Sequence, residues 1–208
     1  MTSTNKAGRS GLILILSGPS GSGKSSIYKT AIGDLGTIEF SVSCTTRAPR
    51  PGEVDGSDYH FISREEFDRL VAEDAFAEHA EVHGNCYGTL KTELLGRVQR
   101  GIDVLLDIDV QGAAQLRRLC ESSCEFRRAC VFIFIMPPSF EELERRLRGR
   151  ATETEESILR RLANAKGEMA HASEYDHIIV NDDLARAAAE FTALVRGLRD
   201  DPARQIKS

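Results

Sequence analysis

The chain has no long apolar run. The stretches LILIL (residues 12–16) and VFIFIM (residues 131–136) are far shorter than a membrane-spanning helix, which needs about 20 residues. The first ten residues, MTSTNKAGRS, are polar and do not resemble the apolar core of a secretory signal. We therefore expect a cytoplasmic protein without a membrane partner.

An excess of positive charge is also missing. The 208 residues include 27 Lys and Arg against 32 Asp and Glu, giving a formal net charge of −5. A protein that binds nucleic acid usually has a broad basic field, so we expect no nucleic-acid partner. An anionic ligand must instead be held by local clusters of basic residues.

Cysteines are too few, and odd in number, for a disulfide framework. The five lie at positions 44, 86, 120, 124 and 130. No CxxC pair occurs, and no histidine lies at metal-ligand spacing from Cys120 and Cys124. Reduced thiols are therefore a simpler interpretation than a metal site.

Apolar stretches alternate with helical patterns over most of the chain. Strands are expected at 12–16, 104–109, 131–136 and 176–181, the last as a short buried strand. Helices are expected at 25–35, 111–120, from Ser139 onward, and 183–198. This alternation predicts an α/β fold with a parallel sheet flanked by helices, formed by residues 11–37 and 93–200. Polar tails occupy 1–10 and 201–208.

Residues 38–92 have a different sequence pattern from the rest of the chain and are interpreted as a small mixed α+β insert. They contain short alternating stretches, many turn residues and one clear helix, SREEFDRLVAED. Ser63 and Glu66 have the spacing of a capping box at its start, and Ser139 and Glu142 have the same spacing later in the chain.

The segment GPSGSGKSS matches the pattern G-x-x-x-x-G-K-[ST] between an apolar strand and a helix. In such a P-loop, glycines let backbone N–H groups point at phosphate oxygens, and the helix adds its N-terminal dipole. A flexible glycine–serine turn is the alternative, but the strand and the helix around it favour nucleotide binding. We expect Lys24 to reach the outer phosphates of ATP and Ser25 to bind Mg²⁺. The predicted ATP-binding residues are Gly18, Pro19, Ser20, Gly21, Ser22, Gly23, Lys24, Ser25 and Ser26.

A P-loop alone leaves two classes open, since a hydrolase needs only water whereas a kinase needs a second pocket for an acceptor. Arg47 and Arg50 lie three residues apart and suit a second phosphate. Tyr59 and Tyr87 are candidate neutral donors to the same group. Each of these residues taken singly is also common on solvated loops.

Glu78 suits guanine as the base of the acceptor. The guanine edge presents the adjacent donors N1–H and N2–H₂, whereas adenine lacks the N2 amine and has an acceptor at N1. A fixed carboxylate therefore accepts guanine and rejects adenine. The hydroxyls of Ser43 and Thr89 are candidate donors to guanine O6.

Together with the P-loop, the segments SVSCTTRAPRPGEVDGSDYHF, GNCYGT, LDIDVQG and RLRGRATETEESILRRL resemble the guanylate kinase family over residues 12–195. The resemblance implies transfer of the ATP γ-phosphoryl group to GMP with Mg²⁺. It also implies a P-loop NTPase core, a GMP-binding insert and a mobile helical lid near 145–160. The GMP-binding residues that it implies are Ser43, Arg47, Arg50, Glu53, Tyr59, Glu78, Tyr87 and Thr89, with Glu53 supporting the arginines.

In LDIDVQG, strand alternation is expected to point Asp107 and Asp109 the same way, beside the P-loop. We assign Asp107 to Mg²⁺ through water and favour Asp109 for the guanine edge. A strand-end turn with two solvated carboxylates is the alternative.

Six arginines lie in RRLRGRATETEESILRR, a pattern that is also typical of a solvated helical face. A kinase, however, must neutralise the transferring phosphoryl group from a moving segment. By the family pattern, the catalytic residues are Lys24, Arg47, Arg146, Arg150 and Arg161. The segment VNDDL resembles the adenine-side loop of the family and assigns Asn181 to ATP.

Two other functions compete with this prediction. One is a catalytically silent relative that binds a peptide in the GMP cleft, and the other is a kinase for a different nucleoside monophosphate. The presence of Lys24, Ser25, Arg146 and Arg161 disfavours the first, and Glu78 with Ser43 disfavours the second. The sequence leaves monomer and homodimer open.

Overall fold

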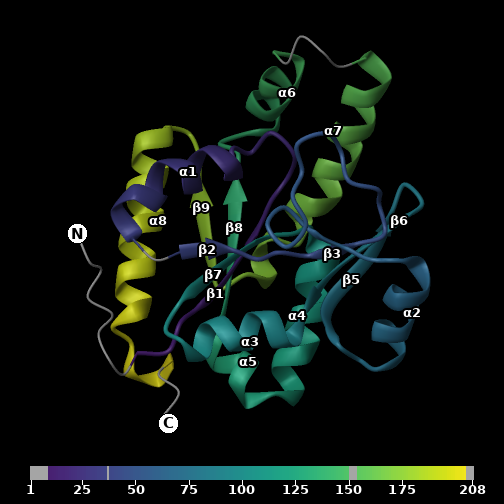
Figure 1. Cartoon of the computed structure of the whole chain (residues 1–208). Helices are drawn as coiled ribbons and strands as arrows, with labels where there is room; N and C mark the ends of the chain where they lie inside the picture. The colour runs from purple at the N-terminus through teal and green to yellow at the C-terminus, as the bar shows by residue number, and fades with distance from the viewer. Residues whose placement is uncertain (1–8, 37, 150–153, 205–208) are drawn as a thin grey trace.

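The computed structural model describes residues 9–36, 38–149 and 154–204, and its centre is a parallel sheet of five strands (Figure 1). The strand order is β2-β7-β1-β8-β9, and every pair is parallel. The strands are β1 (Ile13–Ser17), β2 (Ile38–Phe40), β7 (Asp103–Asp107), β8 (Cys130–Met136) and β9 (His177–Val180). The predicted fold class, an α/β core of P-loop type, is confirmed.

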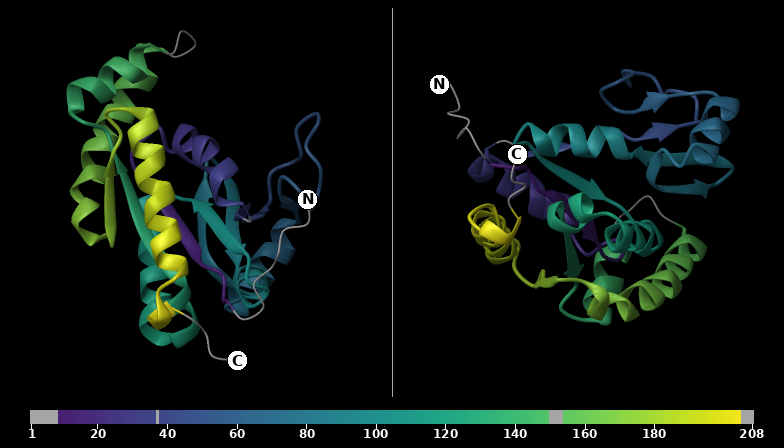
Figure 2. Two further views of the ribbon diagram at one scale, coloured as in Figure 1. Left: turned by 90° about the vertical axis from the view of Figure 1, so that its left-hand side faces the viewer. Right: turned by 90° about the horizontal axis from the view of Figure 1, so that it is seen from below.

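Helices cover both faces of this sheet because successive side chains of a strand point to opposite sides. Leu14 and Leu16 of β1 pack with α1 (Lys24–Leu35) and α8 (Leu184–Arg199) on one face. Ile13 and Ile15 pack with the helices of the other face (Figure 2). Those helices are α3 (Lys91–Gln99), α4 (Val110–Ser122) and α5 (Cys124–Ala129).

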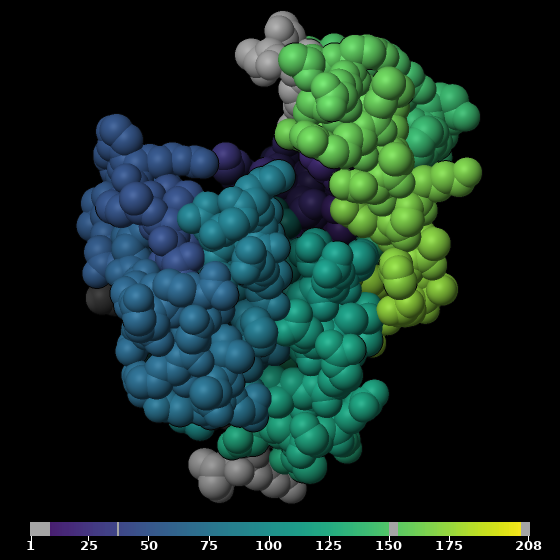
Figure 3. All heavy atoms as spheres, turned by 90° about the vertical axis from the view of Figure 1, so that its right-hand side faces the viewer, coloured from purple at the N-terminus to yellow at the C-terminus, as the bar shows by residue number. Residues whose placement is uncertain are grey.

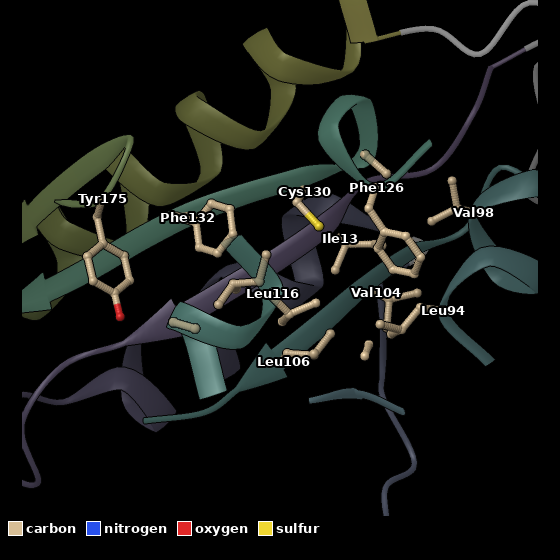
Figure 4. Packing of buried hydrophobic residues seen from close by; sticks show 14 of the residues in the cluster. Ile13, Leu94, Val98, Val104, Leu106, Leu116, Phe126, Cys130, Phe132 and Tyr175 are labelled. Carbon is tan, nitrogen blue, oxygen red and sulfur yellow. The ribbon is translucent and has the colours of Figure 1, made fainter. Parts of the chain in front are cut away.

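Figure 4 shows this second face, where Val104 and Leu106 of β7 meet Leu94 of α3, Leu116 of α4 and Phe126 of α5. All five side chains are at most 2% exposed. Burial of an aliphatic or aromatic side chain of this size contributes about 1.5–3 kcal/mol. The two apolar faces therefore fix the sheet and, with it, the carboxyl ends of the strands.

A second, smaller sheet has the order β4-β3-β6-β5. Its strands are β3 (Cys44–Thr45), β4 (His60–Phe61), β5 (Phe76–Val82) and β6 (Asn85–Leu90), and α2 (Arg64–Ala72) packs on it. The pairing is mixed, because β3 and β4 are parallel and the other pairs are antiparallel. β2 pairs with β7 in the main sheet, so this second unit begins at Cys44.

The helices α6 (Phe140–Arg148) and α7 (Glu155–Ala170) project beyond the main sheet and share a small apolar core of their own. The short 3-10 helices η1 (Ala172–Glu174) and η2 (Pro202–Arg204) complete the described elements. Figure 3 shows a hollow between the second sheet and this helix pair, and the dark purple residues at its floor belong to the first part of the described chain. Arg150 lies outside the described residues.

Strand β7 ends two residues earlier than the sequence predicts. It stops at Asp107, and Asp109 is the N-cap of α4, where its Oδ1 accepts from the backbone N–H groups of Gln111 and Gly112 at 3.0 and 2.9 Å. The expectation that the strand continues to Asp109 is wrong, since Asp109 is the N-cap of α4, so strand alternation does not apply to this pair. Aspartate at an N-cap satisfies helix N–H groups that otherwise lack partners.

The expectation that β9 is buried is also wrong. Ile179 is buried, but Ile178 and Val180 are 44% and 38% exposed. Ile178 and Val180 alternate with Ile179 and so lie on the opposite face of this edge strand from the side that packs with α1 and α8.

Both predicted capping serines are found at helix starts. Ser63 accepts from the backbone N–H of Glu66 at 3.1 Å, and Ser139 accepts from that of Glu142 at 3.2 Å. The two glutamate side chains instead bind arginines about one turn later, as in the 2.7 Å pair between Glu66 and Arg69. Arginine competes successfully because it offers a charge-assisted bond.

Within the described part of the chain, no helix is long and apolar enough to cross a bilayer. The same residues contain no cluster of three or more histidine, cysteine or acidic side chains arranged to hold a metal ion. All five cysteines are free.

Candidate active site

The P-loop connects β1 to α1 at the carboxyl end of the main sheet. Gly23 begins α1 with a φ of 93°, which is unfavourable for residues with a side chain. A Cβ at Gly23 would lie only 2.1 Å from Nδ2 of Asn181. Ser25 and Ser26 occupy the exposed first turn of α1, where the helix N-terminus favours anions.

Lys24 lies between the P-loop and the end of β7. Its Nζ donates to the carbonyl of Gly18 at 2.7 Å and is 3.6 Å from Oδ1 of Asp107. Burial raises the pKa of Asp107, and the Lys24 charge opposes this shift. Ser25 and Asp107 therefore offer a hydroxyl and a carboxylate beside the loop, the hard oxygen donors that Mg²⁺ prefers.

Asn181, predicted to contact adenine, is buried behind the P-loop at 5% exposure. Its Nδ2 donates to the carbonyl of Ser22 at 2.7 Å. The backbone carbonyl of Asn181 accepts from Nη2 of Arg146 at 2.9 Å. Asn181 thus braces the loop, and Arg146 links α6 to the same brace.

The predicted phosphate-binding residues of the insert form a connected group. Nη2 of Arg47 is 2.8 Å from Oε1 of Glu53, and the backbone N–H of Arg50 donates to Oε2 at 2.7 Å. The hydrogen bond from Arg47 is the main reason that the pKa of Glu53 is lowered. The guanidinium of Arg47 lies 5.5 Å from the Tyr59 ring centroid, and the Tyr59 and Tyr87 rings are 6.0 Å apart. The Arg50 side chain is exposed.

Glu78 is a buried carboxylate at the centre of the second group. It is 7% exposed, and its Oε1 accepts from the Thr89 hydroxyl at 2.6 Å. The Ser43 and Thr89 hydroxyls are 3.1 Å apart. Burial raises the pKa of Glu78, and the nearby charge of Asp109 adds to this shift. The predicted base-reading residues therefore lie together, with Asp109 near them from α4.

A cavity of about 160 Å³ lies between the insert and the end of strand β7 of the main sheet. Ser43, Tyr59 and Thr89 line it from the insert, and Leu106 and Asp107 line it from the end of β7. The sequence did not single out two further lining residues, Ser41 and Asp58. The Ser41 hydroxyl is buried and has no hydrogen-bond partner among the described residues. Such a group is recognisable only in three dimensions, because serine is common in loops.

The arm formed by α6 and α7 reaches the P-loop through Arg161, whose Nη1 donates to the Ser20 hydroxyl at 3.0 Å. A second hollow of about 440 Å³ lies between α7 and the start of α4. Its lining includes Asp109 and Glu168. Burial raises the pKa of Glu168, while Lys24 opposes the shift. Glu168 was not predicted, because its position within the helix carries no sequence signal.

The cavity lined by Ser43, Tyr59 and Thr89 thus also reaches Asp107, whose Oδ1 is 3.6 Å from Lys24 of the P-loop. The family profile of guanylate kinases matches residues 10–197. The chain belongs to the guanylate kinase family. It is therefore a nucleoside monophosphate kinase by family, as the sequence predicts.

Individual members agree with this assignment. A guanylate kinase of Syntrophotalea carbinolica is 52% identical, and the match covers 90% of this chain and 86% of the relative. A guanylate kinase of Thiobacillus denitrificans is 46% identical, with 95% and 91% covered. The crystal structure of guanylate kinase from Anaplasma phagocytophilum has a TM-score of 0.70 and 38% identity, covering 95% of this chain and 91% of that chain.

Proposed function

We propose that this guanylate kinase transfers the γ-phosphoryl group of ATP to GMP, giving ADP and GDP, with the two nucleotides bound at the residues described above. The observation that carries the proposal is the buried Glu78 carboxylate, held by Thr89 at 2.6 Å. Thr89 lines a cavity that also reaches Asp107, which is 3.6 Å from Lys24 of the P-loop. A hydrolase needs only water beside the γ-phosphate and has no need of a separate acceptor pocket.

The acceptor base binds at Glu78. Oε1 and Oε2 accept from guanine N1–H and N2–H₂, and Ser43 donates to O6. Thr89, whose single hydroxyl proton goes to Oε1 of Glu78, holds the carboxylate in place. Burial raises the pKa of Glu78, and two adjacent guanine donors favour the ionised form again. Adenine would leave the buried carboxylate without the two donors of the guanine edge, which disfavours AMP.

The acceptor phosphate binds at the insert arginines. Arg47 and Arg50 provide the positive charge, and Tyr59 and Tyr87 provide neutral donors. Glu53 fixes the Arg47 guanidinium through the 2.8 Å ion pair and the turn at Arg50 through a 2.7 Å bond. This preorganisation aims the phosphate oxygen of GMP at the P-loop.

The donor nucleotide binds at the P-loop. The backbone N–H groups of residues 18–26 hold the ATP phosphates, and Lys24 moves from the Gly18 carbonyl to a phosphate oxygen. Ser25 directly and Asp107 through water would hold Mg²⁺, which supplies charge neutralisation at the phosphates when bound. Asn181 keeps the loop in shape by binding the Ser22 carbonyl.

The α6–α7 arm acts as a lid. Arg161 already contacts Ser20 of the P-loop, and Arg146 contacts the loop brace at Asn181. On closure, these arginines and Arg150 neutralise the transferring phosphoryl group. They also exclude water, so that ATP is not hydrolysed in place of transfer.

The free thiols of all five cysteines are typical of a reducing compartment, so we place the reaction in the cytoplasm.

The proposal is tested by an acceptor panel in which GMP, AMP, CMP and UMP are each supplied with ATP and Mg²⁺. We expect ADP release to depend strongly on GMP and only weakly on the others. Lys24→Ala serves as the inactive control with an intact fold. Equal ADP release with every acceptor, or none with GMP, would refute the proposal.

A further inference from the structure

Strand β5 lies at the edge of the second sheet, with β6 on one side only. In an antiparallel pair, the N–H and C=O groups of alternate residues point away from the partner strand and need other partners at an edge. At His79, one side chain of the core supplies both partners. The His79 N–H donates to Oε1 of Gln115 at 3.0 Å, and Nε2 of Gln115 donates to the His79 carbonyl at 2.9 Å.

Gln115 lies on α4, which is anchored to the main sheet by other residues. Ala113 and Leu116 of this helix are fully buried in the core of the main sheet. The Gln115 amide is therefore a two-bond clamp between the core and the strand that carries the base-reading carboxylate.

The same helix face also meets Glu78. Gly112 precedes Gln115 by three residues, so the two lie on one side of α4. A Cβ at Gly112 would lie 3.2 Å from Oε2 of Glu78, so the carboxylate fits closely over the helix at a glycine. Glu78 is the residue next to His79, and any shift of the strand at His79 moves this carboxylate.

We infer that Gln115 is a positioning residue for guanine recognition: its amide clamps β5 at His79 and so fixes the Glu78 carboxylate over Gly112. The inference rests on the proposed function, because it assigns Glu78 to the base. Gln115 lines a crevice of about 340 Å³ that shares no lining residue with the cavity of about 160 Å³ holding Ser43 and Thr89. It therefore acts through Glu78 and the strand, without touching the nucleotide.

The test compares GMP with inosine monophosphate (IMP), which lacks only the exocyclic N2 amine. Discrimination between them depends on the Glu78 oxygen that accepts from N2–H₂, and therefore on the exact position of this carboxylate. Gln115→Met keeps the length of the side chain and removes both hydrogen bonds. We expect the ratio of kcat/KM for GMP to that for IMP to fall about 10-fold, with the KM for ATP unchanged.

A second variant, Gln115→Glu, retains the bond from the His79 N–H and provides the same test if the methionine variant folds poorly. The ratio of kcat/KM for GMP to that for IMP is expected to fall in this variant as well. The matched control is Gln99→Met, because Gln99 is exposed at the end of α3 and belongs to neither the proposed ATP site nor the proposed GMP site. Thermal unfolding of each variant reports whether the fold is intact.

The outcomes separate the inference from the proposed function. If Glu78→Gln lowers the GMP-to-IMP ratio and folded Gln115→Met does not, the inference is overturned and the proposed function stands. An equal loss of kcat/KM on GMP and IMP, with a lower melting temperature, would assign Gln115 a purely structural role and also overturn it. An unchanged ratio in Glu78→Gln would refute the base assignment of the proposed function itself.

Discussion

Replacement of Glu78 by glutamine keeps the shape of the side chain and changes one acceptor into a donor. In the native protein Oε1 accepts from Thr89 at 2.6 Å and Oε2 faces Gly112. With glutamine, an NH₂ group meets a guanine donor. The loss of a charge-assisted bond, about 1.5–3 kcal/mol, adds to the penalty of an unpaired buried donor, about 1–3 kcal/mol. We expect kcat/KM for GMP to fall at least about 60-fold, corresponding to the lower sum of about 2.5 kcal/mol.

The stability of this variant should change in the opposite direction. Burial raises the pKa of Glu78, so the folded protein binds this proton more tightly than the unfolded chain. The stabilisation from the protonated form is complete below the ordinary glutamate pKa of about 4.3 and is lost as pH rises through the raised value. Glu78→Gln, which carries no charge at any pH, should therefore melt at a higher temperature than the native protein at pH 7. This advantage should disappear near pH 4.

The assays are steady-state kinetics with GMP and AMP, and thermal unfolding followed by circular dichroism at pH 7 and pH 4. Glu81→Gln is the matched control, because Glu81 is on the same strand and its side chain is 56% exposed. An unchanged preference for GMP over AMP in Glu78→Gln would refute the assignment of this carboxylate to the base. A lower melting temperature at pH 7 would refute the reasoning from burial.

Three further predictions follow from other contacts. Glu53→Gln removes the negative charge and one of the two acceptors that hold Arg47 and the turn at Arg50, so the KM for GMP should rise about 10-fold with the KM for ATP unchanged; a rise in both would contradict the assignment. Asn181→Ala leaves the Ser22 carbonyl unpaired, so the KM for ATP and GTP should rise by the same factor; an effect on ATP alone would indicate an adenine contact. Asp103, whose side chain is fully buried, binds two arginines, so Asp103→Ala should lower the free energy of unfolding by about 3–5 kcal/mol in urea. A loss below about 1 kcal/mol would contradict this.

The sequence predicts the main elements because local signals and the fold agree there. The apolar run at 12–16 becomes the central strand β1, and the P-loop follows it with the expected helix. The prediction fails at Asp109 because two local rules compete. Alternation favours a longer strand, whereas an aspartate before a helix favours an N-cap, and the cap forms.

Side-chain partners were harder to predict than elements. The amide of Asn181 bonds to Ser22, 159 residues away in the sequence, and Gln115 bonds to His79, 36 residues away. No spacing rule connects such pairs, since both depend on how helices and sheets pack. The capping glutamates are different, because an arginine three residues after Glu66 is visible in the sequence and explains why its side chain leaves the cap.

The most direct test of the central claim measures ADP and GDP together in one reaction of the native protein with ATP, GMP and Mg²⁺. Phosphoryl transfer within the cleft predicts that ADP and GDP form in equal amounts and that neither forms at a comparable rate when GMP is omitted. ADP formed without GDP would mean that water is the acceptor, and it would contradict the assignment of the insert as a GMP site.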